Sequence, residues 1–136
     1  MTLVDTNVLL DLVTDDPDWA EWSVAKLEEA ALKGALAIND VVYAELSVRY
    51  DRIEDLEAML EDAAIEVAST PREALFLAAK AFSQYRKSGG ARTGVLPDFF
   101  IGAHPAVSGF PLLTRDGRRY RTYFPTLDLI APQQER

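Results

Sequence analysis

The stretch that decides the fold is Leu3-Val4-Asp5-Thr6-Asn7-Val8-Leu9-Leu10. Two apolar residues precede Asp5 and a second apolar run follows Asn7, a pattern that predicts one short strand ending at Asp5 and a helix directly after it. In a parallel α/β sheet, the carboxyl end of a strand opens into the crevice where ligands bind. Asp5 is therefore expected at the rim of such a crevice, either as the cap of the helix or as a ligand.

The composition is typical of one ordinary globular domain. The chain has 136 residues, of which 49% are hydrophobic and 26% charged, enough to bury a core. We expect a single domain over 1–130 and a polar tail over 131–136. The absence of cysteine excludes disulfides, thiolate catalysis and a cysteine zinc site. No apolar run approaches the ~20 residues that span a bilayer and no signal peptide is visible, so we expect a cytoplasmic protein without a membrane partner.

The charge is acidic overall, with a net value of -8. Such a charge argues against broad electrostatic binding to nucleic acid. The excess of acid is compatible with solubility, with a basic partner or with carboxylates around metal ions. The basic residues gather in two groups, Arg86, Lys87 and Arg92 in one and Arg115, Arg118, Arg119 and Arg121 in the other.

Beyond the first helix, short apolar runs alternate with helical patterns. Further strands are expected at 35–38, 65–67, 111–114 and 127–130. One helix is expected to start with Asp16 as its N-cap, and another with a capping box that begins at Thr70. Strands that alternate with helices predict an α/β fold, with a small, mostly parallel sheet of about four or five strands flanked by helices on both faces.

Three further acids stand at positions with two interpretations each. Glu45 falls near the centre of the apolar arc of its predicted helix, where a carboxylate needs a metal or a partner such as Arg49. Asp98 lies in the first turn of a helix that Pro97 opens, a position that the helix dipole also favours for any acid. Asp116 follows an apolar strand, but it is also the first residue of an ordinary Asp-Gly turn.

The pattern of the acids is more informative than any one of them. Asp5 and Asp116 both follow apolar strands, so they are expected at the same rim of a parallel sheet, bordered by the helices of Glu45 and Asp98. Four converging carboxylates would repel one another by about 4 kcal/mol per pair at ~4 Å with an effective dielectric near 20. A cation has to hold them together, and oxygen ligands favour Mg²⁺ or Mn²⁺. Such ions support phosphodiester attack by water, so the residues predict a nuclease-type site.

The segments that carry these acids resemble the four acidic motifs of PIN domains, and among PIN domains those of the VapC-type toxins of bacterial toxin–antitoxin pairs. The segments are Leu3-Val4-Asp5-Thr6-Asn7-Val8-Leu9, Ala44-Glu45-Leu46, Pro97-Asp98-Phe99-Phe100-Ile101-Gly102-Ala103 and Leu112-Leu113-Thr114-Arg115-Asp116. The ending Tyr120-Arg121-Thr122-Tyr123-Phe124-Pro125 also looks like that subgroup. The resemblance implies a three-layer α/β/α fold and an Mg²⁺- or Mn²⁺-dependent endoribonuclease.

In that resemblance, each motif residue has an implied role. The catalytic and metal-binding acids would be Asp5, Glu45, Asp98 and Asp116, and Asn7 and Thr114 match the supporting polar positions. The implied partners are a cognate antitoxin, a second copy of the chain within a toxin–antitoxin assembly, and structured RNA such as transfer or ribosomal RNA. Candidates for RNA phosphate contacts are Arg115, Arg118 and Arg119, with Arg86, Lys87 and Arg92 as a second set, and a solvated surface is the alternative for both sets.

The segment His104-Pro105 departs from the family pattern. His104 is expected to be structural or solvent-facing, and Pro105 is expected to kink or end the helix that carries Asp98 upstream of it. A phosphatase or phosphotransferase with Asp5 as nucleophile remains an alternative, although such enzymes usually carry a second acid where this chain has Asn7. A receiver-like or catalytically inactive interaction domain is the other alternative.

Overall fold

Five short strands form one parallel sheet in the computed structural model, which describes residues 1–92 and 94–132. The strands are β1 (Thr2–Val4), β2 (Leu36–Asn39), β3 (Ile65–Ala68), β4 (Leu112–Leu113) and β5 (Leu129–Ile130), in the spatial order β3-β2-β1-β4-β5. Strand β1 lies in the centre, where Leu3 is paired with Ala37 on one side and with Leu112 on the other. All neighbouring pairs are parallel, so the carboxyl ends of β1 and β4 meet at one edge.

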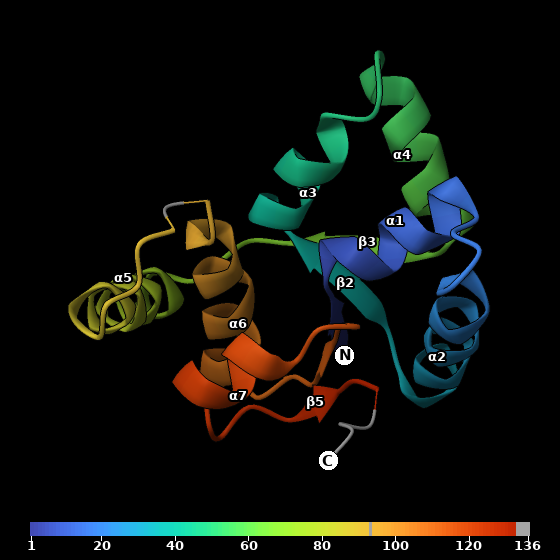
Figure 1. Cartoon of the computed structure of the whole chain (residues 1–136). Helices are drawn as coiled ribbons and strands as arrows, with labels where there is room; N and C mark the ends of the chain where they lie inside the picture. Colours follow the sequence, from blue (N-terminus) through green and yellow to red (C-terminus); the bar gives the residue numbers. More distant parts are fainter. Residues whose placement is uncertain (93, 133–136) are drawn as a thin grey trace.

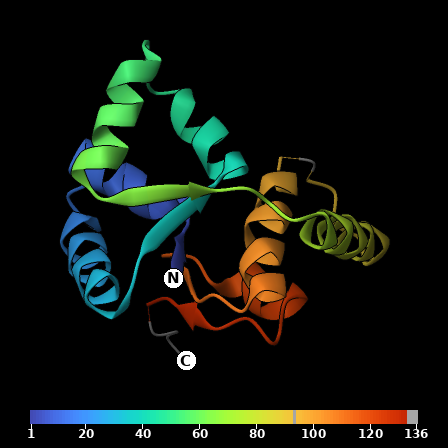
Figure 2. The ribbon, with the colours of Figure 1, turned by 180° about the vertical axis from the view of Figure 1, so that it is seen from behind.

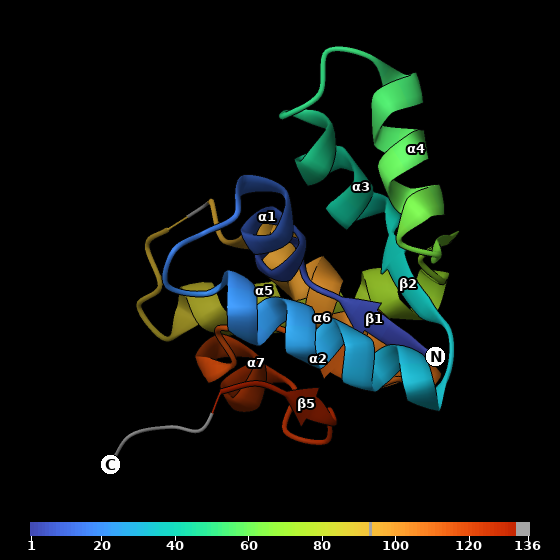
Figure 3. The ribbon, with the colours of Figure 1, turned by 90° about the vertical axis from the view of Figure 1, so that its right-hand side faces the viewer.

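Helices cover both faces of this sheet. They are α1 (Thr6–Thr14), α2 (Ala20–Lys33), α3 (Asp40–Ser47), α4 (Ile53–Asp62), α5 (Arg72–Lys87), α6 (Leu96–Ser108) and α7 (Arg118–Tyr123). Figures 1 and 2 show α5, α6 and α7 on one side of the sheet and α1, α2 and α4 on the other. Figure 3 shows α3 and α4 projecting beyond the end of the sheet. The predicted α/β class with helices on both faces is confirmed.

The core follows from the apolar sequences of the inner strands. Strands β1, β2 and β4 are buried along their whole length, as expected for parallel strands that are covered on both faces. The apolar stripes of the helices close on them, with Val8 and Leu9 from α1 and Phe99 and Ile101 from α6 among the fully buried side chains. None of the described helices is long and apolar enough to cross a membrane.

Two predicted helix starts differ from the structure. The carboxylate of Asp16 accepts hydrogen bonds from the backbone N–H groups of Asp18 at 2.9 Å and Trp19 at 3.0 Å, as an N-cap does, but residues 17–19 form a turn and α2 begins only at Ala20. The capping box at Thr70 is wrong, because the hydroxyl of Thr70 donates to the carboxylate of Asp40 and α5 starts at Arg72 without a side-chain cap. Capping patterns identify the approximate start of a helix, but not its exact first residue.

Pro105 was expected to kink or end α6, and it does not end the helix. The helix continues to Ser108, although proline removes one backbone hydrogen bond. Residues Ile101 and His104 on the same turns are buried, and this packing offsets the missing bond. His104 is structural, since its Nδ1 lies 3.4 Å from the Nδ2 of Asn39 at the start of α3.

Helix α7 is an element that the sequence analysis did not assign. It packs against α6 at Gly102, where an added Cβ would stand 2.7 Å from the ring of Phe124 and 2.8 Å from the ring of Tyr120. Glycine is therefore required at this position because no side chain fits between the two helices. The contact fixes the position of Tyr120 relative to α6.

We expect Gly102→Ala to destabilise the protein by about 1–3 kcal/mol, because the added methyl forces two buried rings to move. Urea denaturation followed by circular dichroism measures the free energy of unfolding. Gly94→Ala is the matched control, since no atom lies within 4 Å of its added Cβ, and its effect should stay within about 0.5 kcal/mol. Equal stability of the two variants would contradict the tight contact between α6 and α7.

Candidate active site

A pocket of about 530 Å³ brings the four predicted acids together. It lies beyond the carboxyl ends of β1 and β4, between helices from both sides of the sheet. Asp5 comes from the end of β1, Glu45 from α3, Asp98 from the first turn of α6 and Asp116 from the loop after β4. The other lining residues are Thr6, Asn7, Leu10, Val48, Arg49, Arg119 and Tyr120.

Asp5 is the most buried of the four acids, with 5% of its surface exposed. Its Oδ1 accepts a hydrogen bond from the backbone N–H of Thr6 at 2.7 Å, so it does cap α1. Its Oδ2 accepts from the hydroxyls of Tyr120 at 2.8 Å and Thr114 at 2.9 Å. Burial raises the pKa of Asp5 from 3.8 to about 6, although the hydrogen bonds from Tyr120 and Thr114 favour the ionised form.

Asn7 and Thr114 connect β1 to the loop that carries Asp116. The Nδ2 of Asn7 lies 3.5 Å from the Oδ2 of Asp5 and 3.3 Å from the hydroxyl of Thr114. The Oδ1 of Asn7 accepts from the backbone N–H of Arg115 at 3.2 Å, and the hydroxyl of Thr114 accepts from the backbone N–H of Asp116 at 3.1 Å. These bonds fix the start of the loop relative to Asp5.

Glu45 faces the pocket from α3, a helix that starts directly after β2. Its Oε1 accepts a hydrogen bond from the hydroxyl of Thr6 at 2.5 Å. The alternative partner, Arg49, forms no ion pair with Glu45 in the described part of the chain. The apolar position of Glu45 on its helix is therefore explained by the pocket rather than by an internal ion pair.

Asp98 is paired with a cation that belongs to the protein itself. The Nη1 of Arg119 lies 2.6 Å from the Oδ2 of Asp98, and its guanidinium carbon lies 5.9 Å from the centroid of the Tyr85 ring. Partial burial raises the pKa of Asp98, Arg119 lowers it, and the neighbouring carboxylates of Glu45 and Asp116 raise it again. The acids of the pocket are thus close enough to repel one another.

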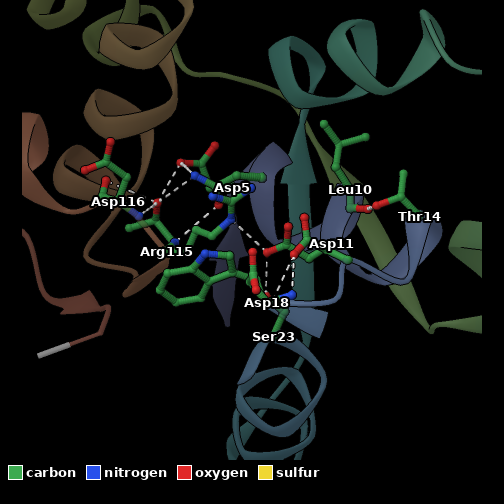
Figure 4. Close-up of polar contacts among 12 residues, drawn as sticks. Asp5, Leu10, Asp11, Thr14, Asp18, Ser23, Arg115 and Asp116 are labelled. Atoms are coloured by element: carbon green, nitrogen blue, oxygen red, sulfur yellow. Dashed lines mark hydrogen bonds and ion pairs between the residues drawn. The ribbon is translucent and has the colours of Figure 1, made fainter. Parts of the chain in front are cut away.

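The other arginines named from the sequence have different surroundings. The Nε of Arg115 donates to the Oδ2 of Asp11 at 2.9 Å, and the same oxygen accepts from the hydroxyl of Ser23 at 2.9 Å (Figure 4). Its guanidinium also lies 5.5 Å from the centroid of a Trp19 ring. Arg115 therefore joins the loop after β4 to α1 and α2. Exposed side chains are found at Arg118, Arg86, Lys87 and Arg92.

The acids fit a hard divalent cation in kind, since all of them offer oxygen. The pKa of Asp98 is raised mainly by burial and further by the carboxylates of Glu45 and Asp116, a repulsion that a cation would relieve. In the described ranges, no three His, Asp or Glu side chains are grouped closely enough to hold an ion. Asp98 is turned toward Arg119 and Glu45 toward Thr6. The pocket therefore holds the right donors, two of which are hydrogen-bonded to Arg119 and Thr6.

Two residues at the site were not identified from the sequence. Tyr120 contacts Asp5 directly, and Asp11 anchors Arg115. A signal for the first was present, because Tyr120, Tyr123 and Phe124 have the i, i+3, i+4 spacing of a helix face. For Asp11, no local pattern distinguishes a buried acid from an exposed one on α1.

Comparisons with known proteins give a consistent result. The PIN domain family model matches residues 2–125, while no curated protein matches the chain. A chain of the VapBC2 complex from Rickettsia felis, solved with a promoter DNA fragment, has a TM-score of 0.73 and 19% identity, covering 97% of this chain and 98% of that one. A chain of DNA-bound VapBC from Salmonella typhimurium has a TM-score of 0.69 and 16% identity, with 96% of each chain covered. A chain of a toxin–antitoxin complex from Klebsiella pneumoniae has a TM-score of 0.61 and 18% identity, covering 99% of this chain and 100% of that one.

The raised pKa of Asp5 predicts how stability depends on pH without added metal. Because the pKa is about 6 in the folded protein and 3.8 as its ordinary value, the contribution of Asp5 is fully present below pH 3.8 and is lost as the pH rises through about 6. The difference corresponds to about 3 kcal/mol.

Urea denaturation in a chelating buffer at several pH values between 4 and 8 measures this effect. The stability of the wild type relative to Asp5→Asn should fall across this range, because the amide does not titrate. A difference that is constant with pH would show that Asp5 is ionised with an ordinary pKa.

Proposed function

The chain belongs to the PIN domain family, whose model matches residues 2–125, and we propose that it is a metal-dependent endoribonuclease acting as the toxin of a bacterial toxin–antitoxin pair. The observation that carries the proposal is the convergence of Asp5, Glu45, Asp98 and Asp116 on one pocket. These acids come from four separate segments of the chain, and local structure alone gives no reason for them to meet. Family membership supports nuclease activity, and the four carboxylates supply the ligands for its metal.

In this proposal, the four acids hold Mg²⁺ or Mn²⁺. Such an ion, when bound, supplies Lewis acidity toward water and toward the phosphate. Asn7 and Thr114 hold the carboxylate of Asp5, and Thr6 holds that of Glu45. The reaction is hydrolysis: the oxygen of a water molecule forms a bond to phosphorus, the bond from phosphorus to the leaving ribose oxygen breaks, and that oxygen takes up a proton.

The basic residues near the pocket would contact the RNA. Arg118 is exposed and lies directly after the loop of Asp116, where its guanidinium can reach a phosphate. Arg119 lines the pocket itself and is available for a phosphate when Asp98 turns to an ion. The exposed Arg86, Lys87 and Arg92 extend the positive surface along α5 and the loop that follows it, and Arg115 supports the loop from its contact with Asp11. Transfer or ribosomal RNA in the cytoplasm would be the substrate.

A cognate antitoxin and a second copy of the chain are the proposed protein partners. The similar chains come from complexes described as VapBC and as toxin–antitoxin, which supports a partner of this kind. The pocket also has an apolar border at Leu10 and at Val48, whose surface is 86% exposed. An antitoxin segment that covers this border would block access to the acids.

The geometry argues against a phosphatase that uses Asp5 as its nucleophile. Both carboxylate oxygens accept hydrogen bonds, one from Thr6 and the other from Tyr120 and Thr114. The residue is 5% exposed, which restricts the approach of Asp5 to a phosphorus atom. Asn7 stands where such enzymes carry a second acid, and its amide cannot transfer a proton. A role as a metal ligand needs neither.

The central test is metal-dependent cleavage of a mixture of transfer RNAs. We expect cleavage with Mn²⁺ or Mg²⁺ and none with a chelator, and a loss of about 100-fold or more in Asp98→Asn and in Asp116→Asn, because each removes a charged ligand. Asp128→Asn is the matched control, since Asp128 is exposed and lines a different pocket near β5. Wild-type activity in both pocket variants would exclude the acidic site.

Arg119 and Arg118 should have separable effects. Arg119→Ala should strengthen Mn²⁺ binding about threefold to fivefold, because it removes a cation that competes for Asp98, an effect of roughly 0.6–1 kcal/mol at a partly exposed pair. Arg118→Ala should weaken RNA binding and leave Mn²⁺ binding unchanged. Calorimetry measures the metal affinity and filter binding the RNA affinity. Unchanged Mn²⁺ affinity in Arg119→Ala would mean that the ion pair does not oppose the metal.

A further inference from the structure

The hydroxyl of Tyr120 is placed on one oxygen of Asp5. It donates to the Oδ2 of Asp5 at 2.8 Å, and Tyr120 is 3% exposed. The Oδ1 of Asp5 accepts from the backbone N–H of the next residue, Thr6. The second oxygen lies 3.5 Å from the amide of Asn7, and its two shorter hydrogen bonds come from the hydroxyls of Tyr120 and Thr114, which are distant in the sequence.

The ring of Tyr120 has little freedom to move. It lies against Gly102 of α6, where even a Cβ would approach one of its carbons to 2.8 Å. Since the ring is packed on the backbone of α6, the position of its hydroxyl is determined by that helix. Asp98 lies on the same helix, one turn before Gly102. The ring thus connects the carboxylate at the end of β1 to the helix that carries a second acid of the pocket.

The two hydroxyls also supply the hydrogen bonds that the buried carboxylate of Asp5 needs. A carboxylate that is 5% exposed is costly unless each oxygen accepts hydrogen bonds. Thr114 donates from the end of β4 and Tyr120 from α7, and both bond Oδ2, whereas the backbone of Thr6 bonds Oδ1. Removal of the Tyr120 hydroxyl leaves Thr114 and the longer contact of Asn7 to hold Oδ2, so the orientation of the carboxylate becomes less restricted.

We propose that Tyr120 is a positioning residue, which holds the carboxylate of Asp5 in the orientation that binds the metal ion. This inference rests on the proposed nuclease function and assigns a role to a residue outside the acidic quartet. Tyr120 acts through Asp5 and contacts neither the ion nor the RNA. Polar groups that orient metal ligands commonly contribute about 10- to 100-fold to metal affinity.

The experiment compares two tyrosines of the same helix. Tyr120→Phe removes the hydroxyl that contacts Asp5 and keeps the ring on Gly102. Tyr123→Phe is the matched control, since its ring packs against Phe99 and Tyr85. Calorimetry with Mn²⁺ should show at least about 10-fold weaker binding for Tyr120→Phe and wild-type binding for Tyr123→Phe. With RNA, kcat should fall for Tyr120→Phe while KM stays unchanged, because the substrate contacts are intact.

A measurement on the wild-type protein covers the case that Tyr120→Phe does not fold. With ¹³C at the ζ carbon of tyrosine, addition of Mg²⁺ should shift the resonance of Tyr120 and leave that of Tyr123 in place. A Tyr120 signal that does not move at saturating Mg²⁺ would overturn the proposal, as would wild-type Mn²⁺ affinity and kcat in a folded Tyr120→Phe. If the wild type itself neither binds Mn²⁺ nor cleaves RNA, the nuclease proposal fails and this one with it.

Discussion

The structure depends on the burial of one carboxylate at the end of its central strand. Asp5 is placed between β1 and α1, where it is shielded from water by both neighbouring strands. A carboxylate in such a position requires hydrogen-bond donors, and its own segment supplies the backbone N–H of Thr6 at 2.7 Å and the amide of Asn7 at 3.5 Å. The others come from Thr114 and Tyr120, more than 100 residues away in the chain. The sheet order that puts β4 beside β1 is what makes this arrangement possible.

The short helix α7 contacts the two sides of the pocket at once. Arg119 pairs with Asp98, and the next residue, Tyr120, donates to Asp5. The two contacts differ in kind, because a guanidinium brings a positive charge and a phenol brings only a donor. The guanidinium of Arg119 offsets the charge of Asp98, and the phenol of Tyr120 adds no charge beside Asp5. In the proposed function, a metal ion would replace Arg119 beside Asp98, while the hydrogen bond from Tyr120 to Asp5 would remain.

The sequence predicted the strands of the sheet and the positions of the acids, but not the hydrogen-bond and ion-pair partners of those acids. Apolar runs identified the strands because parallel strands are buried on both faces, and this placed Asp5 and Asp116 at one edge. The cap expected at Thr70 failed because its hydroxyl contacts Asp40, whereas Asp16 makes the expected local bonds and the residues after it form a turn before the helix begins. Helix α7 has six residues, and although the spacing of Tyr120, Tyr123 and Phe124 indicates its buried face, its place in the fold depends on the contact with Gly102. The pair of Arg119 and Asp98 joins distant segments, so no local pattern contains it.

Keeping the acids together lowers the stability of the folded protein. Burial raises the pKa of Asp5 to about 6, so the folded protein pays a free energy near neutral pH to keep this carboxylate ionised. Glu45 and Asp116 add to the same cost at Asp98, and Arg119 offsets part of it. A fold selected for stability alone would replace these acids with neutral residues. Their arrangement around one pocket supports the proposed site for a divalent cation, in which a bound cation would relieve the repulsion.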